Sequence, residues 1–309
     1  VTGSEDGFVR VWNATTHINI RSANAIPGGE VTSVAFSPDG QYVAAGLDDD
    51  TMNIYYATNL TSIHGTISVD VGSGDYVNDV EFSPDSSLVA VSIGRSGNGG
   101  TNGQVFLIQV ANGQNLYSLN PSNEDRFYDS AFSPDGEHIA LAGNGDFYIV
   151  NVSSRATVWS ITDPPASVNA IAWSPDGKKL VFTSDRSGSP QIYEVVIKNG
   201  KPKRLSFEGV YNVRPRYSPD GKSITLVHSV DNSYHIAVLN LDNGYISVLT
   251  DGPLDESPSY APNGSMVIYA TTGRRGGQLA AISVDGRIKQ RLGLHQGDVR
   301  EPAWGPFLK

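Results

Sequence analysis

Apolar and polar residues alternate in short segments along the whole chain. VTSVAF (31–36), YVAAGL (42–47), MNIYYA (52–57) and IHGTIS (63–68) follow one another with polar turns between them. Alternation with a period of two is typical of half-buried β-strands, and no stretch has the period of an amphipathic helix. The pattern therefore predicts an all-β chain built from units of four antiparallel strands.

One turn motif recurs in every unit. It reads FSPDG, WSPDG or YSPDG, with degenerate copies such as YAPNG. Its shared proline stands at positions 38, 84, 134, 175, 219, 262 and 306. In such a turn the proline fixes φ, the aspartate bonds the backbone, and the glycine takes the left-handed position. Spacings of 41 to 50 residues suit the blades of a β-propeller. Seven copies predict a seven-bladed β-propeller of four-stranded antiparallel blades, with residues 1–309 as a single domain.

The two ends of the chain complement each other. Residues 1–24 hold three strand-like segments, and residues 298–309 hold one more, VREPAW. We expect residues 298–309 to complete the blade begun by residues 1–24, because a closed ring leaves no sheet edge free. The aromatic residue before each turn is expected to pack between neighbouring blades. These aromatic residues are Phe36, Phe82, Phe132, Trp173 and Tyr217.

The charge changes along the chain. Residues 1–165 carry 5 Arg, no Lys and 19 acidic residues, whereas residues 166–309 carry 17 basic and 13 acidic residues. This contrast indicates two series of repeats with different ancestry. The net charge of −10 argues against nucleic-acid binding, since no basic stripe could follow phosphates. No apolar run reaches the roughly 18 residues of a membrane span, and the opening VTGSEDGFVR has no signal-like segment.

Each series resembles a known family. GSEDGFVRVWNATT resembles a WD40 blade, although its last pair is Trp12-Asn13 instead of Trp-Asp, and we assign residues 1–172 to this type. TSDRSGSPQIYEV, LTDGPLDESPSYAPNGSMVIYAT and GDVREPAW resemble, in order, the carboxy-terminal propeller blades of the bacterial TolB family, which gives residues 173–309. Because a blade contacts mainly its neighbours, such units can be joined. The change near residue 173 predicts a chimeric or engineered protein.

The resemblance also implies a function. The TolB propeller is a docking platform for a peptidoglycan-associated lipoprotein and for extended peptides, and WD40 rings hold peptides or proteins on the equivalent face. Both families imply a non-enzymatic scaffold that binds peptide or protein, and the TolB-like half implies a periplasmic parent. We expect a monomer. Two alternatives stay open: a natural TolB-like periplasmic adaptor, and a propeller enzyme with catalytic groups gathered at the channel.

Linear motifs for chemistry are missing from the sequence. It has no Cys, no paired His spacing, no GxSxG elbow and no P-loop, so we predict no catalytic residue, no metal site and no cofactor. The loops between second and third strands and between successive units are expected to share one face. Candidate binding residues on this loop face are Asp185, Arg186, Tyr211, Arg214, Asp255, Glu256, Asp298, Arg300 and Glu301. Their acidic balance predicts weak binding of Ca²⁺ in the channel, or of a basic peptide.

Overall fold

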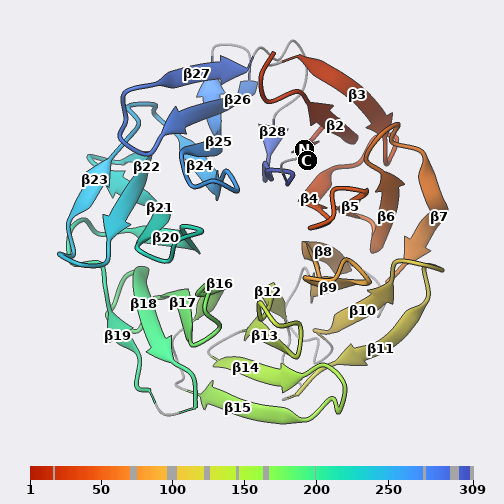
Figure 1. Cartoon of the computed structure of the whole chain (residues 1–309), viewed down its shortest axis with the longest axis horizontal. Coiled ribbons are helices and arrows are strands. Elements are labelled where there is room, and N and C mark those ends of the chain that lie inside the picture. The colour runs from red at the N-terminus through yellow and green to blue at the C-terminus, as the bar shows by residue number, and fades with distance from the viewer. Residues whose placement is uncertain are drawn as a thin grey trace.

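The strands form a closed ring around an open centre, and the two ends of the chain lie close together beside it (Figure 1). The structure, a computed structural model, describes residues 1–16, 18–69, 75–95, 103–121, 126–143, 146–162, 167–198, 200–273, 276–292 and 299–306. Every element within these ranges is a β-strand. The prediction of an all-β propeller is therefore confirmed.

Six sheets have four antiparallel strands each, and the first strand of each sheet lies innermost. They comprise β4 (Val31–Phe36), β5 (Tyr42–Leu47), β6 (Thr51–Tyr56) and β7 (Ser62–Ser68); β8 (Asp75–Phe82), β9 (Leu88–Arg95), β10 (Val105–Gln109) and β11 (Asn115–Leu119); β12 (Phe127–Phe132), β13 (His138–Gly143), β14 (Asp146–Asn151) and β15 (Thr157–Thr162); β16 (Val168–Trp173), β17 (Lys179–Ser184), β18 (Gln191–Val196) and β19 (Lys203–Arg204); β20 (Asn212–Tyr217), β21 (Ser223–Val230), β22 (Ser233–Asn240) and β23 (Ile246–Val248); and β24 (Asp255–Tyr260), β25 (Met266–Gly273), β26 (Gly276–Ser283) and β27 (Lys289–Leu292).

The prediction of seven four-stranded blades is wrong, because the described residues form six. The ends of the chain form two two-stranded sheets instead. These sheets pair β1 (Gly3–Ser4) with β28 (Val299–Arg300), and β2 (Phe8–Trp12) with β3 (Asn19–Asn24). An isolated bridge between Thr2 and Arg10 links them.

The short β28 explains this difference. Only Val299 and Arg300 of VREPAW pair as a strand, with Ser4 and Gly3 of β1, and the ladder does not resume after Glu301 and Pro302. Beyond this break, Val1 and Ala303 exchange backbone hydrogen bonds of 2.8 and 3.0 Å. The terminal segments therefore meet at the ring closure through few ladder bonds.

The repeated turn is built by its own side chains. Ser37 Oγ donates a 2.6 Å hydrogen bond to Asp39 Oδ1, and this oxygen also accepts the backbone N–H of Gln41 at 2.9 Å. Gly40 then takes a φ of 73°, which would strain a residue with a Cβ. The same serine-to-aspartate bond recurs at Ser83–Asp85, Ser133–Asp135, Ser174–Asp176 and Ser218–Asp220. The motif thus fixes the hairpins that lead out of the inner strands β4, β8, β12, β16 and β20.

Apolar clusters between neighbouring sheets hold the ring together. Each predicted aromatic residue lies in such a cluster, as predicted: Phe36, Phe82, Phe132, Trp173 and Tyr217. Trp173 packs with Phe147 and Phe182, and its indole Nε1–H donates a 2.9 Å hydrogen bond to the carbonyl of Ala131 in the preceding sheet. The aromatic position therefore joins one blade to the next.

Candidate functional site

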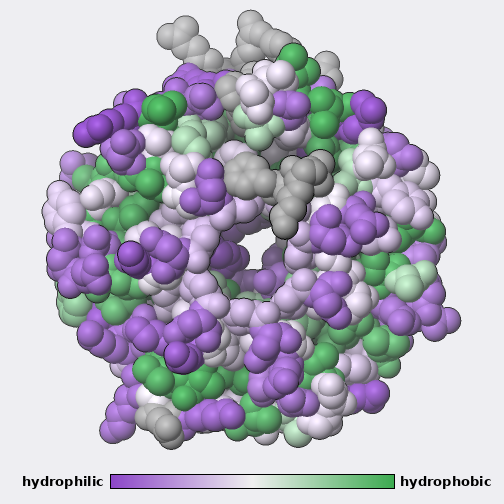
Figure 2. Space-filling view, in the orientation of Figure 1, coloured by the Kyte–Doolittle hydropathy of each residue, from purple (hydrophilic) through white to green (hydrophobic). Residues whose placement is uncertain are grey.

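The inner strands line a central channel, which opens at the centre of the face in Figure 2, where hydrophilic residues surround it. Two cavities of about 380 and 320 Å³ occupy the channel. They share Ser33, Asp79, Asp129, Arg214, Arg216 and Glu301 as lining residues. The two cavities are therefore parts of one polar space.

The lining follows a simple sequence rule. The residues five positions before the motif prolines are Ser33, Asp79, Asp129, Ala170, Arg214, Ser257 and Glu301, and all of them line the channel. Six of the residues three positions before the prolines line the larger cavity: Glu81, Ala131, Ala172, Arg216, Ser259 and Ala303. Side chains two residues apart in a strand point to the same side. The repeat therefore sets two tiers of side chains facing the channel.

One side of the channel is acidic. Asp79 Oδ1 accepts a 3.2 Å hydrogen bond from Ser33 Oγ, and Glu81 Oε2 accepts the backbone N–H of Phe132 at 2.8 Å. Burial, followed by the charge of Asp129, raises the pKa of Asp79 well above its usual value. Burial, followed by the charge of Asp79, does the same to the pKa of Glu81. Both carboxyl groups consequently hold their protons to higher pH than exposed acids do.

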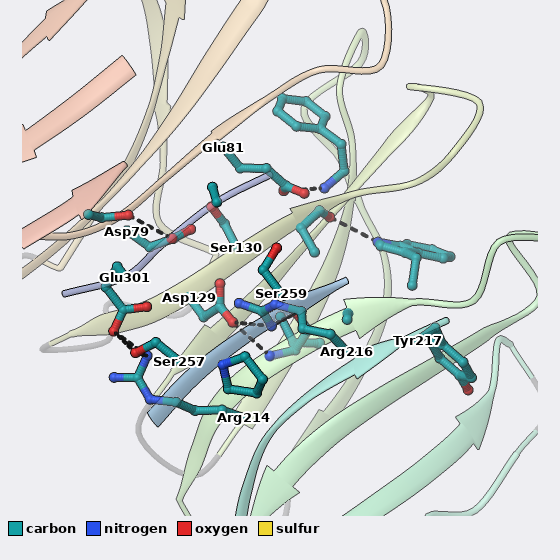
Figure 3. A pocket seen from close by; sticks show the side chains of 18 of the residues that line it. Asp79, Glu81, Asp129, Ser130, Arg214, Arg216, Tyr217, Ser257, Ser259 and Glu301 are labelled. Carbon is teal, nitrogen blue, oxygen red and sulfur yellow. Dashed lines mark hydrogen bonds and ion pairs between the residues drawn. The ribbon is translucent and has the colours of Figure 1, made fainter. Parts of the chain in front are cut away.

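The opposite side carries two arginines, each tied to an acid (Figure 3). Arg216 Nη1 lies 3.3 Å from Asp129 Oδ2 and donates to the carbonyl of Ile171 at 3.2 Å. Ala170 and Ala172 occupy the channel positions of the intervening strand β16. Their small side chains leave room for the Arg216 side chain to extend to Asp129. The Arg216 side chain keeps 40% of its area exposed, because it faces the channel.

Arg214 forms a second cluster at the ring closure. Its Nη1 forms an ion pair with Glu301, and Ser257 Oγ donates a 2.9 Å hydrogen bond to Glu301 Oε1. The carboxylate of Glu301 raises the pKa of Arg214, so this guanidinium stays charged. The cluster joins β20, β24 and the segment after β28 across the channel wall.

An unusual backbone positions this cluster. Arg214, Ser257 and Glu301 have φ values of 56°, 53° and 42°, and each is followed by a proline. Strand pairing shifts its register between Val213 and Arg216, and likewise in β24. Non-glycine residues in the left-handed region cost about 1–3 kcal/mol and gather at functional sites. The bulges therefore mark this wall of the channel as a candidate site.

The structure brings some of the predicted binding residues together. Tyr211, Arg214 and Glu301 line the smaller cavity. The charge of Glu256 acts on both Arg214 and Tyr211, and burial raises the pKa of Tyr211. These four residues thus lie around one end of the channel.

Other predicted residues stabilise loops instead. Asp255 is only 1% exposed, and its carboxylate accepts hydrogen bonds from Thr271 Oγ1 and from the backbone N–H of Gly252. Asp185 Oδ1 accepts the N–H of Ser167 at 2.7 Å. Arg186 lies over the rings of Phe182 and Tyr193, at 5.3 and 5.1 Å from their centres. Asp298 lies outside the described residues, as does the side chain of Arg300.

Sequence reasoning missed the acidic side of the channel. It searched the loops, whereas Asp79, Glu81, Asp129 and Arg216 stand on inner strands. The fixed offset of three or five residues before the motif proline would have found all four.

An apolar patch lies beside the channel. Antiparallel pairing places the connections β19–β20, β21–β22 and β23–β24 at the same end of the strands. These connections and the strand ends beside them carry the apolar residues here called the apolar patch: Phe207, Val210, Tyr211, Val230, Tyr234 and Leu254. Phe207 and Val210 are 73% and 74% exposed. The Tyr211 and Tyr234 rings meet edge to face at 5.4 Å, and Tyr234 bridges to Leu254. The patch therefore continues from the channel residue Tyr211 onto the loops.

One group of potential metal ligands occurs among the described residues. Asp135, Glu137 and His138 have ligand atoms within 4.8 Å of one another on a repeated turn. Asp135 already accepts bonds from Ser133 Oγ and Glu137 N–H there. Across the described ranges, no helix is long and apolar enough to cross a membrane.

Family comparisons match most of the chain. Residues 104–308 match the family described as TolB beta propeller domain, and residues 22–55 match the WD domain, G-beta repeat. Both predicted resemblances are confirmed. The TolB match begins well before residue 173, and the comparisons do not support a chimeric or engineered origin.

Curated relatives share the carboxy-terminal part. The chain is 44% identical over 162 residues to the Tol-Pal system protein TolB of Bordetella pertussis, covering 52% of this chain and 37% of the relative. It is 46% identical over 116 residues to the TolB of Xanthomonas campestris pv. campestris, covering 37% of this chain and 26% of the relative. The matched part of the chain thus spans between about a quarter and two fifths of the length of these relatives.

Solved structures share the fold. Hydrazine synthase of Kuenenia stuttgartiensis has a TM-score of 0.68 at 18% identity, over 89% of this chain and 81% of that one, which is a likeness of fold alone. TolB from Acinetobacter baumannii has a TM-score of 0.63 at 32% identity, over 90% of this chain and 67% of that one. With the family match over residues 104–308, these findings show that the chain belongs to the TolB beta propeller family.

Proposed function

We propose that this chain is a natural TolB-like adaptor that binds a partner protein of the Tol-Pal type on the face with the apolar patch. The observation that carries the proposal is the exposure of Phe207 and Val210 in the connection that leads from β19 to the channel residue Tyr211. Exposed apolar side chains that cluster on a soluble domain mark an interaction site. The relatives are named as proteins of the Tol-Pal system, which supports a protein partner.

The surroundings of the patch suit a protein interface. Tyr211 and Tyr234 offer large rings that lose little conformational entropy on binding, and aromatic residues are common anchors. Arg214 and Glu301 stand next to Tyr211 in the smaller cavity and give a polar rim. A partner segment could therefore bury the patch and end at the channel.

Calorimetry with the purified Pal protein of Bordetella pertussis tests this proposal. We expect binding by the full chain and a loss of at least tenfold in affinity for the double variant Phe207→Ser, Val210→Ser, because anchor truncations cost about 2 kcal/mol or more. Tyr245→Ser is the matched control, since this ring is 61% exposed in the β22–β23 turn, away from the patch. Equal affinities for the double variant and the parent would contradict the proposal.

The enzyme alternative has weaker support. Among the described residues that line the two cavities there is no histidine. Asp129 and Glu301 pair with arginines, Asp79 bonds the hydroxyl of Ser33, and Glu81 bonds a backbone N–H. The likeness to hydrazine synthase carries fold and no chemistry at 18% identity. A binding role accounts better for the exposed patch.

A further inference from the structure

Two carboxyl groups on the acidic side of the channel lack a cationic partner in the described part of the chain. Asp79 is bonded to Ser33 Oγ and Glu81 to the N–H of Phe132, and neither forms an ion pair there. The two nearby arginines are engaged elsewhere, with Asp129 and with Glu301. The charge of Arg216 acts on both carboxyl groups without pairing with either, so a cation bound directly between them would complete this wall.

A buried hydroxyl lies beside them. Ser130 is 2% exposed and lines the larger cavity, and its Oγ has no hydrogen-bond partner within the described ranges. In Figure 3 it lies between Asp79 and Glu81. A buried polar atom without a partner costs about 1–3 kcal/mol, and such atoms in native proteins call for an explanation. A ligand that supplies a donor would satisfy this oxygen.

We propose that Asp79, Glu81 and Ser130 form a binding site for a primary ammonium group. An ammonium carries three N–H donors and no acceptor, which matches two carboxylates and one hydroxyl. The cavity of about 380 Å³ also has room for a short alkyl chain. The ammonium can belong to a free alkylamine or to a lysine side chain of a docked protein. The site goes beyond the proposed function, because a free amine needs no partner protein to reach it.

Binding should depend on pH. Asp79 faces Asp129, Glu301 and Glu81, which favour its protonated form, and Arg216, which opposes it. Glu81 faces Asp79 and Asp129, again opposed by Arg216. Burial adds to these charges, so the pKa values of Asp79 and Glu81 both lie above the usual ones. Only the ionised forms of Asp79 and Glu81 pair with an ammonium, so its binding releases protons from these two groups. The affinity for the ammonium therefore increases as the pH rises through their raised pKa values.

Calorimetric titration of the full chain with butylammonium chloride tests the site. We expect affinity to increase as the pH rises above the usual carboxyl values of 3.8 and 4.5, with proton release revealed by buffers of different ionisation heat. Asp79→Asn and Glu81→Gln should each weaken binding about tenfold, the effect of losing one charge-assisted hydrogen bond. Asp242→Asn is the matched control, because it makes the same change at an exposed position after β22, and it should stay within twofold.

Three results would overturn the inference: no heat from butylammonium, equal affinities for Glu81→Gln and Asp242→Asn, or equal binding of tetramethylammonium, which has no N–H donor. Far-UV circular dichroism checks that each variant is folded.

The peptide Gly-Ser-Lys-Ser-Gly and its acetyl-lysine form then separate the two sources of the ammonium group, a lysine side chain and a free amine. Tighter binding of the unmodified peptide than of butylammonium assigns the site to a lysine, and weaker binding assigns it to a free amine. The variant Phe207→Ser, Val210→Ser should still bind butylammonium, which distinguishes this site from the proposed protein interface.

Discussion

Replacing Trp173 with alanine tests how the blades are held together. The indole packs among Phe147, Phe182 and other residues of two neighbouring sheets, and its N–H bonds the carbonyl of Ala131 at 2.9 Å. Trp→Ala in a full core costs about 3–5 kcal/mol, and Trp173 is only partly buried, so we expect about 3 kcal/mol. Trp173→Phe keeps most of the packing and loses the hydrogen bond, so it should cost about 1 kcal/mol.

Urea denaturation followed by far-UV circular dichroism measures these costs. With a slope of about 3 kcal/mol per molar urea, Trp173→Ala should lower the midpoint by about 1 M at an unchanged slope. Leu116→Ala, at a position 44% exposed, is the control and should stay within about 0.5 kcal/mol. Adding 0.5 M salt to the parent should change its stability less than Trp173→Ala does, because most of the charges are exposed and screened. Equal costs for Trp173→Phe and Trp173→Ala, or a larger effect of salt, would refute the argument that packing joins the blades.

The other predictions concern the ring closure, the channel acids and Ca²⁺. Deleting residues 298–309 removes β28 and the backbone hydrogen bonds between Val1 and Ala303, so light scattering should show aggregation. A truncated chain that melts like the parent would contradict the role of the paired chain ends in closing the ring. Glu81→Gln should stabilise the protein at pH 7, because the raised pKa of Glu81 means that the parent loses stability as the pH rises from the usual 4.5 to the folded-state value. Thermal melts at pH 4 and pH 7 should show a higher melting temperature of the variant at pH 7 only. An equal gain at both pH values would contradict the raised pKa of Glu81. Weak Ca²⁺ binding remains a prediction: calorimetry should show it reduced by Glu256→Gln, whereas Asp255→Asn should mainly lower the melting temperature, because Asp255 is buried against Thr271. No heat from Ca²⁺ with the parent would end that proposal.

The repeat made much of the fold predictable. The serine, aspartate and glycine of each turn act locally, and the aromatic residue before them has one apolar side to bury, so sequence alone indicates both roles. The blade count failed at the ring closure, where VREPAW alternates like a strand but only Val299 and Arg300 pair with β1. Strand alternation gives no sign of such a break.

The site was harder to predict for a related reason. Asp255 reads as a polar loop residue in LDESP, yet Thr271, sixteen residues later, buries it. Asp79 and Arg216 read as ordinary strand residues, and only the closed ring brings them to one channel. Contacts between blades depend on how the ring closes, which no local pattern contains.

Hydrogen–deuterium exchange of the full chain with and without the Pal protein of Bordetella pertussis tests most directly whether a partner protein binds on the apolar patch. We predict slower exchange on binding for backbone amides in residues 205–211, 230–234 and 252–254, which carry the apolar patch. Slower exchange confined to the repeated turns at Gly40, Gly136 and Gly177, or no change at any amide, would contradict it.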